Sequence, residues 1–271
     1  MSNLSLITCV LTTLIFLTAC TSVTTTSSDG TVISATTERP TSKQIEAEIR
    51  NRAAARSNLA AGYMRNGQMA VALDEARKAV VIDPSYADAF GLLGLIYMGL
   101  GEQAQAQENF LRSLKLDPTS PDLNNNYGWF LCQTGRESES FSYFQRALSD
   151  PLYGTPAKAN QNAGTCYAQV KDYVNAERFL RRAIELDAAN NSTKYQLASL
   201  YLKLGQTERA AFYYGLLASS VDTNASTLWL GLRVARAEGN LRSESQLAND
   251  LRQRFPGSPE AARLAAGKFD D

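Results

Sequence analysis

Residues 87–120 read ADAFGLLGLIYMGLGEQAQAQENFLRSLKLDPTS, and this stretch predicts a pair of packed helices. Gly94 and Ala106 are small residues at the positions where the two helices would cross most closely, and Tyr97 is large enough to fill the space beside the crossing. Gly101 lies between the helical segments, where a turn needs a positive φ that glycine adopts at little cost. The stretch therefore has the pattern of one helix-turn-helix unit.

The same pattern recurs along most of the chain. Asp83-Pro84 and Asp117-Pro118 stand 34 residues apart, and each proline would end the second helix of a unit because it cannot continue one. A 34-residue period with aromatic and small residues in constant order resembles the tetratricopeptide repeat (TPR), a unit of two antiparallel helices. We therefore predict an all-α fold, a TPR solenoid of about six helix-turn-helix repeats with a C-terminal capping helix. A helical array of another type is the alternative.

The repeats set the expected organisation of the chain. The TPR domain is predicted at residues 44–271, with units near 53–86, 87–120, 121–156, 157–190, 191–224 and 225–257 and a cap at 258–268. The cap would cover the apolar face that the last unit otherwise exposes.

The first residues of the chain are apolar and lead to a cysteine. Residues 10–17, VLTTLIFL, suit the core of a signal peptide better than a membrane span. The following Leu17-Thr18-Ala19-Cys20 resembles the lipobox of bacterial lipoproteins, which implies that residues 1–19 are a signal peptide and that Cys20 is lipidated. Thr21, where Asp would resemble an inner-membrane retention signal, favours the outer membrane. The alternative is a short transmembrane anchor in which Cys20 is incidental.

A polar segment separates this leader from the repeats. Residues 20–43 are rich in Ser and Thr and hold few apolar residues, so they cannot bury enough surface to offset the entropy of ordering. We predict a disordered tether. The expected location is the outer membrane, with the chain lipid-anchored and facing the periplasm.

Composition narrows the class of function. The chain has 27 basic and 27 acidic residues, which gives no electrostatic reason to expect a nucleic-acid partner. It has no histidine, which removes the usual general base, the Ser-His-Asp and Cys-His systems, and zinc sites that need histidine. We predict that it is not an enzyme, that it uses no cofactor, metal or small-molecule substrate, and that its partner is a protein. A hydrolase built on carboxylates is the alternative.

The first helix of each TPR unit lines the concave face of the stack. On this register the early units present small and apolar residues, and the predicted partner contacts are Leu95, Met98, Asn125 and Trp129. Methionine is adaptable and tryptophan is a frequent hot-spot residue. The alternative is that Trp129 and the methionines pack between helices. Because basic residues are missing from this part of the face, we do not expect a clamp for acidic peptide ends.

The period stretches by two residues between the third and fourth units. The segment at 149–156, SDPLYGTP, predicts a stiff, irregular loop. It is either a tolerated surface insertion or a partner-contact loop, and Tyr153 is then the candidate contact.

Two cysteines flank this loop. Cys132 and Cys166 would lie at nearly the same height on neighbouring first helices. A domain outside the inner membrane is in an oxidising compartment. We predict a Cys132–Cys166 disulfide, and two buried free thiols are the alternative.

Three stretches resemble one family in particular. NNNYGWFLC at 124–132, DPLYGTP at 150–156 and NAGTC at 162–166 are similar to the TPR lipoproteins of type IV pilus biogenesis known as PilF or PilW, the pilotins. The resemblance implies a protein that binds the type IV pilus secretin through its TPR groove and supports secretin localisation and multimerisation, hence pilus biogenesis. The alternative is another periplasmic TPR scaffold lipoprotein, for outer-membrane protein insertion or peptidoglycan synthesis.

Overall fold

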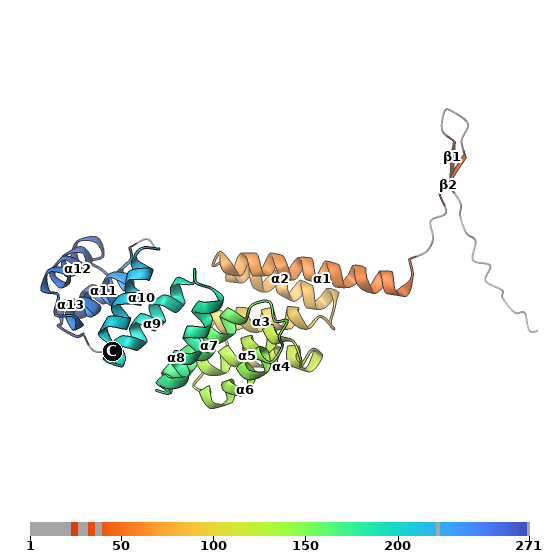
Figure 1. Ribbon diagram of the computed structural model, residues 1–271. Coiled ribbons are helices and arrows are strands. Elements are labelled where there is room, and N and C mark those ends of the chain that lie inside the picture. Colours follow the sequence, from red (N-terminus) through yellow and green to blue (C-terminus); the bar gives the residue numbers. More distant parts are fainter. Residues whose placement is uncertain (1–22, 27–31, 36–39, 221–222, 270–271) are drawn as a thin grey trace, which may run out of the picture. The chain divides into compact units, whose positions relative to one another are not determined.

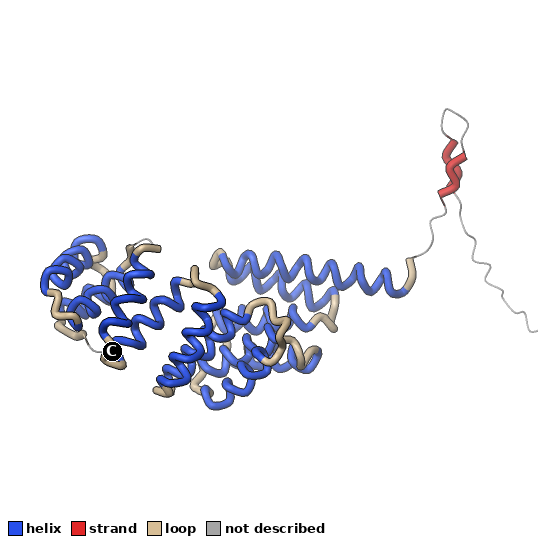
Figure 2. The backbone as a smooth tube through the Cα atoms, in the orientation of Figure 1, coloured by secondary structure: helices blue, strands red, loops and turns tan. Residues whose placement is uncertain are grey.

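Helices make up nearly all of the part of the chain that the structure describes. The computed structural model describes residues 23–26, 32–35, 40–220 and 223–269. Thirteen helices lie within these ranges (Figures 1 and 2), and the predicted all-α TPR solenoid is confirmed. The expected signal peptide and the expected lipid attachment at Cys20 lie outside the described residues.

Consecutive helices form pairs, one pair for each repeat. The pairs are α1 (Ser42–Arg65) and α2 (Met69–Ile82), α3 (Ala87–Gly99) and α4 (Gln103–Leu116), α5 (Pro121–Gln133) and α6 (Glu137–Leu148), α7 (Pro156–Gln169) and α8 (Tyr173–Leu186), α9 (Asn191–Lys203) and α10 (Thr207–Ala218), and α11 (Ala225–Ala237) and α12 (Leu241–Arg254). The last described helix, α13 (Pro259–Ala265), packs on α11 and α12 and so covers the sixth pair.

Two short strands lie in the segment before the first repeat. β1 (Val23–Thr26) and β2 (Val32–Ala35) pair antiparallel within it. Both are rich in β-branched residues, which favour extended backbone. α1 begins at Ser42 because Thr41 and Gln44 form a capping box: the N–H of Thr41 donates to Gln44 Oε1 at 2.7 Å, and the N–H of Gln44 donates to Thr41 Oγ1 at 3.3 Å.

One turn breaks the glycine pattern. The turn between the helices of a pair has a positive φ at Gly101 (79°) and at its counterparts in four other repeats, but the fourth repeat has Lys171 there, with φ 63°. This left-handed conformation disfavours residues with a Cβ. The repeat geometry therefore forces a lysine into a backbone conformation that glycine would adopt freely.

Glycines also bring the two helices of a pair together. A Cβ on Gly94 would lie 2.6 Å from Phe110 Cδ1, and one on Gly164 would lie 2.7 Å from Leu180 Cγ. Phe110 and Leu180 are buried and fill the space that each glycine leaves. The small residues in the sequence pattern are thus the points of closest helix approach.

The pairs stack so that their first helices form a row. α3 contacts α5, α5 contacts α7, α7 contacts α9 and α9 contacts α11. The same face of each first helix therefore recurs along one side of the stack. This row positions the candidate site.

Candidate functional site

A groove runs along the first helices of the first three repeats. It encloses about 300 Å³ between α1, α3 and α5. The lining residues are Ser57, Asn58, Ala61, Tyr86, Asp88, Gly91, Leu92, Leu95, Asp122, Leu123 and Asn126.

Small residues open this groove. Ser57 and Gly91 stand one 34-residue repeat apart at equivalent positions of α1 and α3, and Ala61 lies about one turn beyond Ser57. A Cβ on Gly91 would lie 2.5 Å from Leu123 Cδ2, so a larger residue there would displace Leu123. The repeat period returns small side chains to the same face, and their row forms the depression.

Ser57 gives the groove a polar atom without a partner. Its side chain is buried, and its Oγ has no hydrogen-bond partner among the residues that the structure describes. A buried polar group left unsatisfied costs about 1–3 kcal/mol. Apolar walls with a few polar groups are typical of ligand sites.

Acidic side chains border the groove. Burial raises the pKa of Tyr86, and the neighbouring Asp88 raises it further, so this phenol stays neutral. Asp122 Oδ1 accepts hydrogen bonds from the hydroxyls of Tyr153 and Thr155, each at 3.1 Å. This rim favours a basic or neutral segment of a partner over an acidic one.

Three of the predicted contact residues are partly buried. Leu95 lines the groove and also packs on the core around Phe110. Met98 packs on the same core and does not line the groove. Trp129 packs against the cluster around Cys132 and Cys166. Met98 and Trp129 therefore contribute to the packing between helices and are only partly buried.

The other two predicted contact residues are buried. Asn125 is 0% exposed, and its Oδ1 accepts a hydrogen bond of 3.0 Å from Asn162 Nδ2, which links α5 to α7. Tyr153 is 8% exposed, whereas its neighbour Leu152 is 89% exposed. Only Leu152 of this pair faces solvent, because Tyr153, the candidate contact of the loop, packs against Ala147 and Ala159.

A disulfide lies beside this region. It joins Cys132 of α5 to Cys166 of α7 with their Cα atoms 5.8 Å apart. Both residues are buried, and Ser140 Oγ lies 3.1 Å from Cys166 Sγ. The bridge therefore fastens the third repeat to the fourth on either side of the longer loop.

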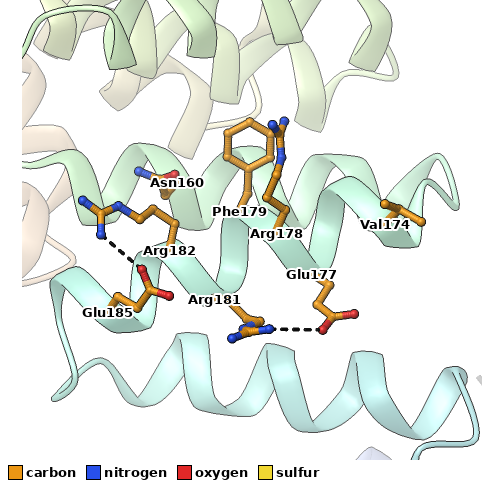
Figure 3. Close-up of a pocket in the computed structure, with 8 residues that line it drawn as sticks. All are labelled: Asn160, Val174, Glu177, Arg178, Phe179, Arg181, Arg182 and Glu185. Carbon is orange, nitrogen blue, oxygen red and sulfur yellow. Dashed lines mark hydrogen bonds and ion pairs between the residues drawn. The ribbon is translucent and has the colours of Figure 1, made fainter.

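A second depression lies over α8 and encloses about 640 Å³ (Figure 3). Its charged side chains pair with one another: Arg182 lies 3.1 Å from Glu185, and Arg181 lies 3.9 Å from Glu177. Arg178 lies over the ring of Phe179 at 4.5 Å from the ring centroid. Because these charged groups already have partners within the chain, the depression has fewer groups available to bind a ligand than the groove has.

The described residues contain no group of three or more acidic, Cys or His residues placed to hold a metal ion. Hydrogen bonds from Lys78 and Arg56 lower the pKa of Glu75, and a hydrogen bond from Arg136 lowers the pKa of Glu139, so both carboxylates stay charged as ion-pair partners. Among the same residues no helix is both long enough and apolar enough to cross a membrane.

Comparison with known proteins supports the repeat assignment. Residues 87–120, 157–190 and 192–219 match a tetratricopeptide-repeat family, and residues 109–141 match a second tetratricopeptide-repeat family.

Two relatives share most of the chain. The type IV pilus assembly protein PilF of Pseudomonas aeruginosa is 28% identical over 210 residues, which are 78% of this chain and 83% of that protein. The crystal structure of PilW, described as a widely conserved type IV pilus biogenesis factor, is 33% identical with a TM-score of 0.74, over 79% of this chain and 98% of PilW. A solved structure of Pseudomonas aeruginosa PilF has a TM-score of 0.71 at 29% identity, over 82% of this chain and 99% of PilF.

Proposed function

The chain belongs to the PilF/PilW family of TPR proteins of type IV pilus biogenesis, and on this premise we propose that it is a pilotin, which binds the pilus secretin through the groove of α1, α3 and α5. The observation that carries the proposal is the groove itself. Ala61, Gly91 and Leu95 give it apolar walls, and Ser57 adds a hydroxyl without a partner. Its volume of about 300 Å³ suits one or two side chains of a bound segment rather than a whole folded surface.

The proposed role includes a membrane anchor. A lipid on Cys20 would hold the repeats at the inner leaflet of the outer membrane, facing the periplasm. Anchoring would raise the effective concentration of the groove near secretin monomers that arrive at that membrane. In this mechanism no covalent bond is made or broken, and capture alone promotes assembly of the secretin ring.

The test is a deletion strain of the source organism, complemented with the wild-type gene or with Cys20→Ala. We expect the deletion to lose detergent-resistant secretin multimers and surface pili, and only the wild-type gene to restore both. Normal multimers in the deletion strain would overturn the pilotin role. Full rescue by Cys20→Ala would overturn the proposed lipid anchor, but it would not contradict secretin binding by the groove.

A further inference from the structure

The sixth repeat has residues at positions equivalent to those that line the groove in the early repeats. Ser57 and Gly91 line the groove, and the counterpart of these two residues in the sixth repeat is Trp229 of α11. In the same register, the counterpart of Met98 is Arg236. The sixth repeat therefore presents an aromatic ring and a guanidinium where the early repeats present small and apolar side chains.

The side chain of Phe269 packs against Trp229 and Arg236 in the sixth repeat. Phe269 stacks on Trp229, with ring centroids 5.5 Å apart and an angle of 15° between the planes. The guanidinium carbon of Arg236 lies 3.9 Å from the centroid of the Phe269 ring. Arg236 is held in position by Glu244 at 3.1 Å. Phe269 thus rests against two side chains that both favour an aromatic ring over an aliphatic group.

Trp229 carries an unsatisfied donor at this place. It is 3% exposed, and its Nε1–H has no hydrogen-bond partner among the described residues. A buried tryptophan N–H usually finds an acceptor. An extended segment of a partner would bring backbone carbonyls that could accept this bond, which the ring of Phe269 cannot do.

Phe269 is separable from the helix before it. α13 is anchored by its own buried residues, Ala261 and Leu264. α13 ends at Ala265, Gly267 follows it with a φ of +64°, and the N–H of Lys268 donates to the carbonyl of Arg263 at 3.0 Å. Because Phe269 lies beyond this turn, its ring can leave Trp229 while α13 stays docked.

We propose that the sixth repeat carries a second binding site, for an aromatic side chain on an extended segment of a partner protein, and that Phe269 fills this site in the free protein. The site is built by Trp229 and Arg236. It does not depend on the identity of the partner bound in the groove of the early repeats.

Tryptophan emission of the full chain tests this proposal. Of the two tryptophans, Trp129→Phe leaves Trp229 as the only reporter. In that background, Phe269→Ala is expected to shift the emission to longer wavelength, because the indole loses its cover. An acetylated peptide with the sequence of residues 266–271, AGKFDD, is expected to reverse the shift with saturation. The same peptide with alanine in place of phenylalanine is the matched control and is expected not to.

Further variants test whether Phe269 competes with the peptide and whether Arg236 contributes to peptide binding. The AGKFDD peptide should bind the chain that retains Phe269 at least about tenfold more weakly, because the site is occupied. Arg236→Gln, added to Phe269→Ala, should weaken peptide binding about threefold through loss of the cation–π contact. Circular dichroism melting shows whether each variant folds.

Three results would overturn the proposal. They are an unchanged emission in Phe269→Ala, equal effects of the two peptides, and equal binding of AGKFDD with and without Phe269. Concentration-dependent dimerisation that Phe269→Ala abolishes would also overturn it, because the occupant would then be a second copy of the chain rather than another protein.

Discussion

The hydroxyl of Tyr153 donates a hydrogen bond of 3.1 Å to Oδ1 of Asp122, a residue that lines the groove. The bond fastens the loop between the third and fourth repeats to the first turn of α5. Within the loop, the N–H of Leu152 donates to Asp150 Oδ1 at 2.8 Å. The longer loop is therefore a support for the groove rim, and it holds Leu152 in solvent on a fixed backbone.

Replacing Tyr153 tests this support. Burial raises the pKa of Tyr153 to about 12, so the phenol is neutral near pH 8 and donates to Asp122. We expect Tyr153→Phe to lower the free energy of unfolding by about 1 kcal/mol at pH 8. The contribution of the phenol is fully present below pH 10, the ordinary pKa of tyrosine, and is lost as the pH rises toward 12, because the unfolded phenol ionises first.

The measurement is urea unfolding of the two proteins at pH 8 and pH 11. The difference in free energy of unfolding should shrink or change sign at the higher pH. A difference that is the same at both pH values would contradict the assigned bond. Leu152→Ser, on the exposed neighbour, is the control and should change the free energy by less than about 0.5 kcal/mol.

The disulfide should stabilise the stack. Cys132 and Cys166 are 34 residues apart in sequence, and closing a loop of this length contributes about 3–4 kcal/mol in the chain-entropy model. We expect the double variant Cys132→Ala, Cys166→Ala to lose this amount in urea unfolding. A reductant should destabilise the wild type by a similar amount and leave the double variant unchanged. Equal stability of wild type and double variant without reductant would show that the bridge contributes nothing.

Two glycine-to-alanine changes should have opposite effects. In Gly94→Ala the new Cβ would meet the ring of Phe110 at 2.6 Å, and we expect a loss of about 1–3 kcal/mol from overpacking. Gly215 in α10 has nothing within 4 Å of the Cβ position, so Gly215→Ala should stabilise by about 0.4–1 kcal/mol through the unfolded state. Thermal unfolding of both variants measures the contrast. Similar shifts of the midpoint in both would refute the close approach of α3 and α4.

Lys171 offers a stabilising change. Its φ of 63° is unfavourable for a lysine, and glycine adopts this conformation without strain at the corresponding turns. We expect Lys171→Gly to raise the free energy of unfolding by about 0.5–1 kcal/mol. Lys203→Gly, inside the last turn of α9, is the comparison and should destabilise by about 1 kcal/mol. Destabilisation by both changes would argue against strain at Lys171.

The repeat period in the sequence predicts most of the fold. Proline, glycine and small residues at constant spacing predict the helix pairs, because each of these residues acts on its own local backbone or helix crossing. The start of α1 at Ser42 is marked in the sequence only by Thr41 and Gln44, which have the spacing of a capping box. Its signal is a short motif beside a Ser- and Thr-rich segment, where composition alone favours disorder.

The side chains of the site were less predictable. Asn125 stands in the same register as Ser57 and Gly91, yet Asn162 of the next repeat covers it. Tyr153 lies in an irregular loop, and only the position of Asp122 shows that its hydroxyl points inward. Burial of this kind depends on contacts between repeats, whereas a repeat pattern reports on one repeat at a time.

The most direct test of the proposed function is a binding measurement between the purified full chain and the type IV pilus secretin of the same organism. Leu95→Lys places a charge in the groove, and Val174→Lys places the same charge at an exposed residue of α8 that lines the second depression. We predict that Leu95→Lys weakens binding by at least about tenfold, as expected for a central contact, and that Val174→Lys binds like the wild type. Equal binding by a correctly folded Leu95→Lys variant, or loss of binding only in Val174→Lys, would contradict the assignment of the groove.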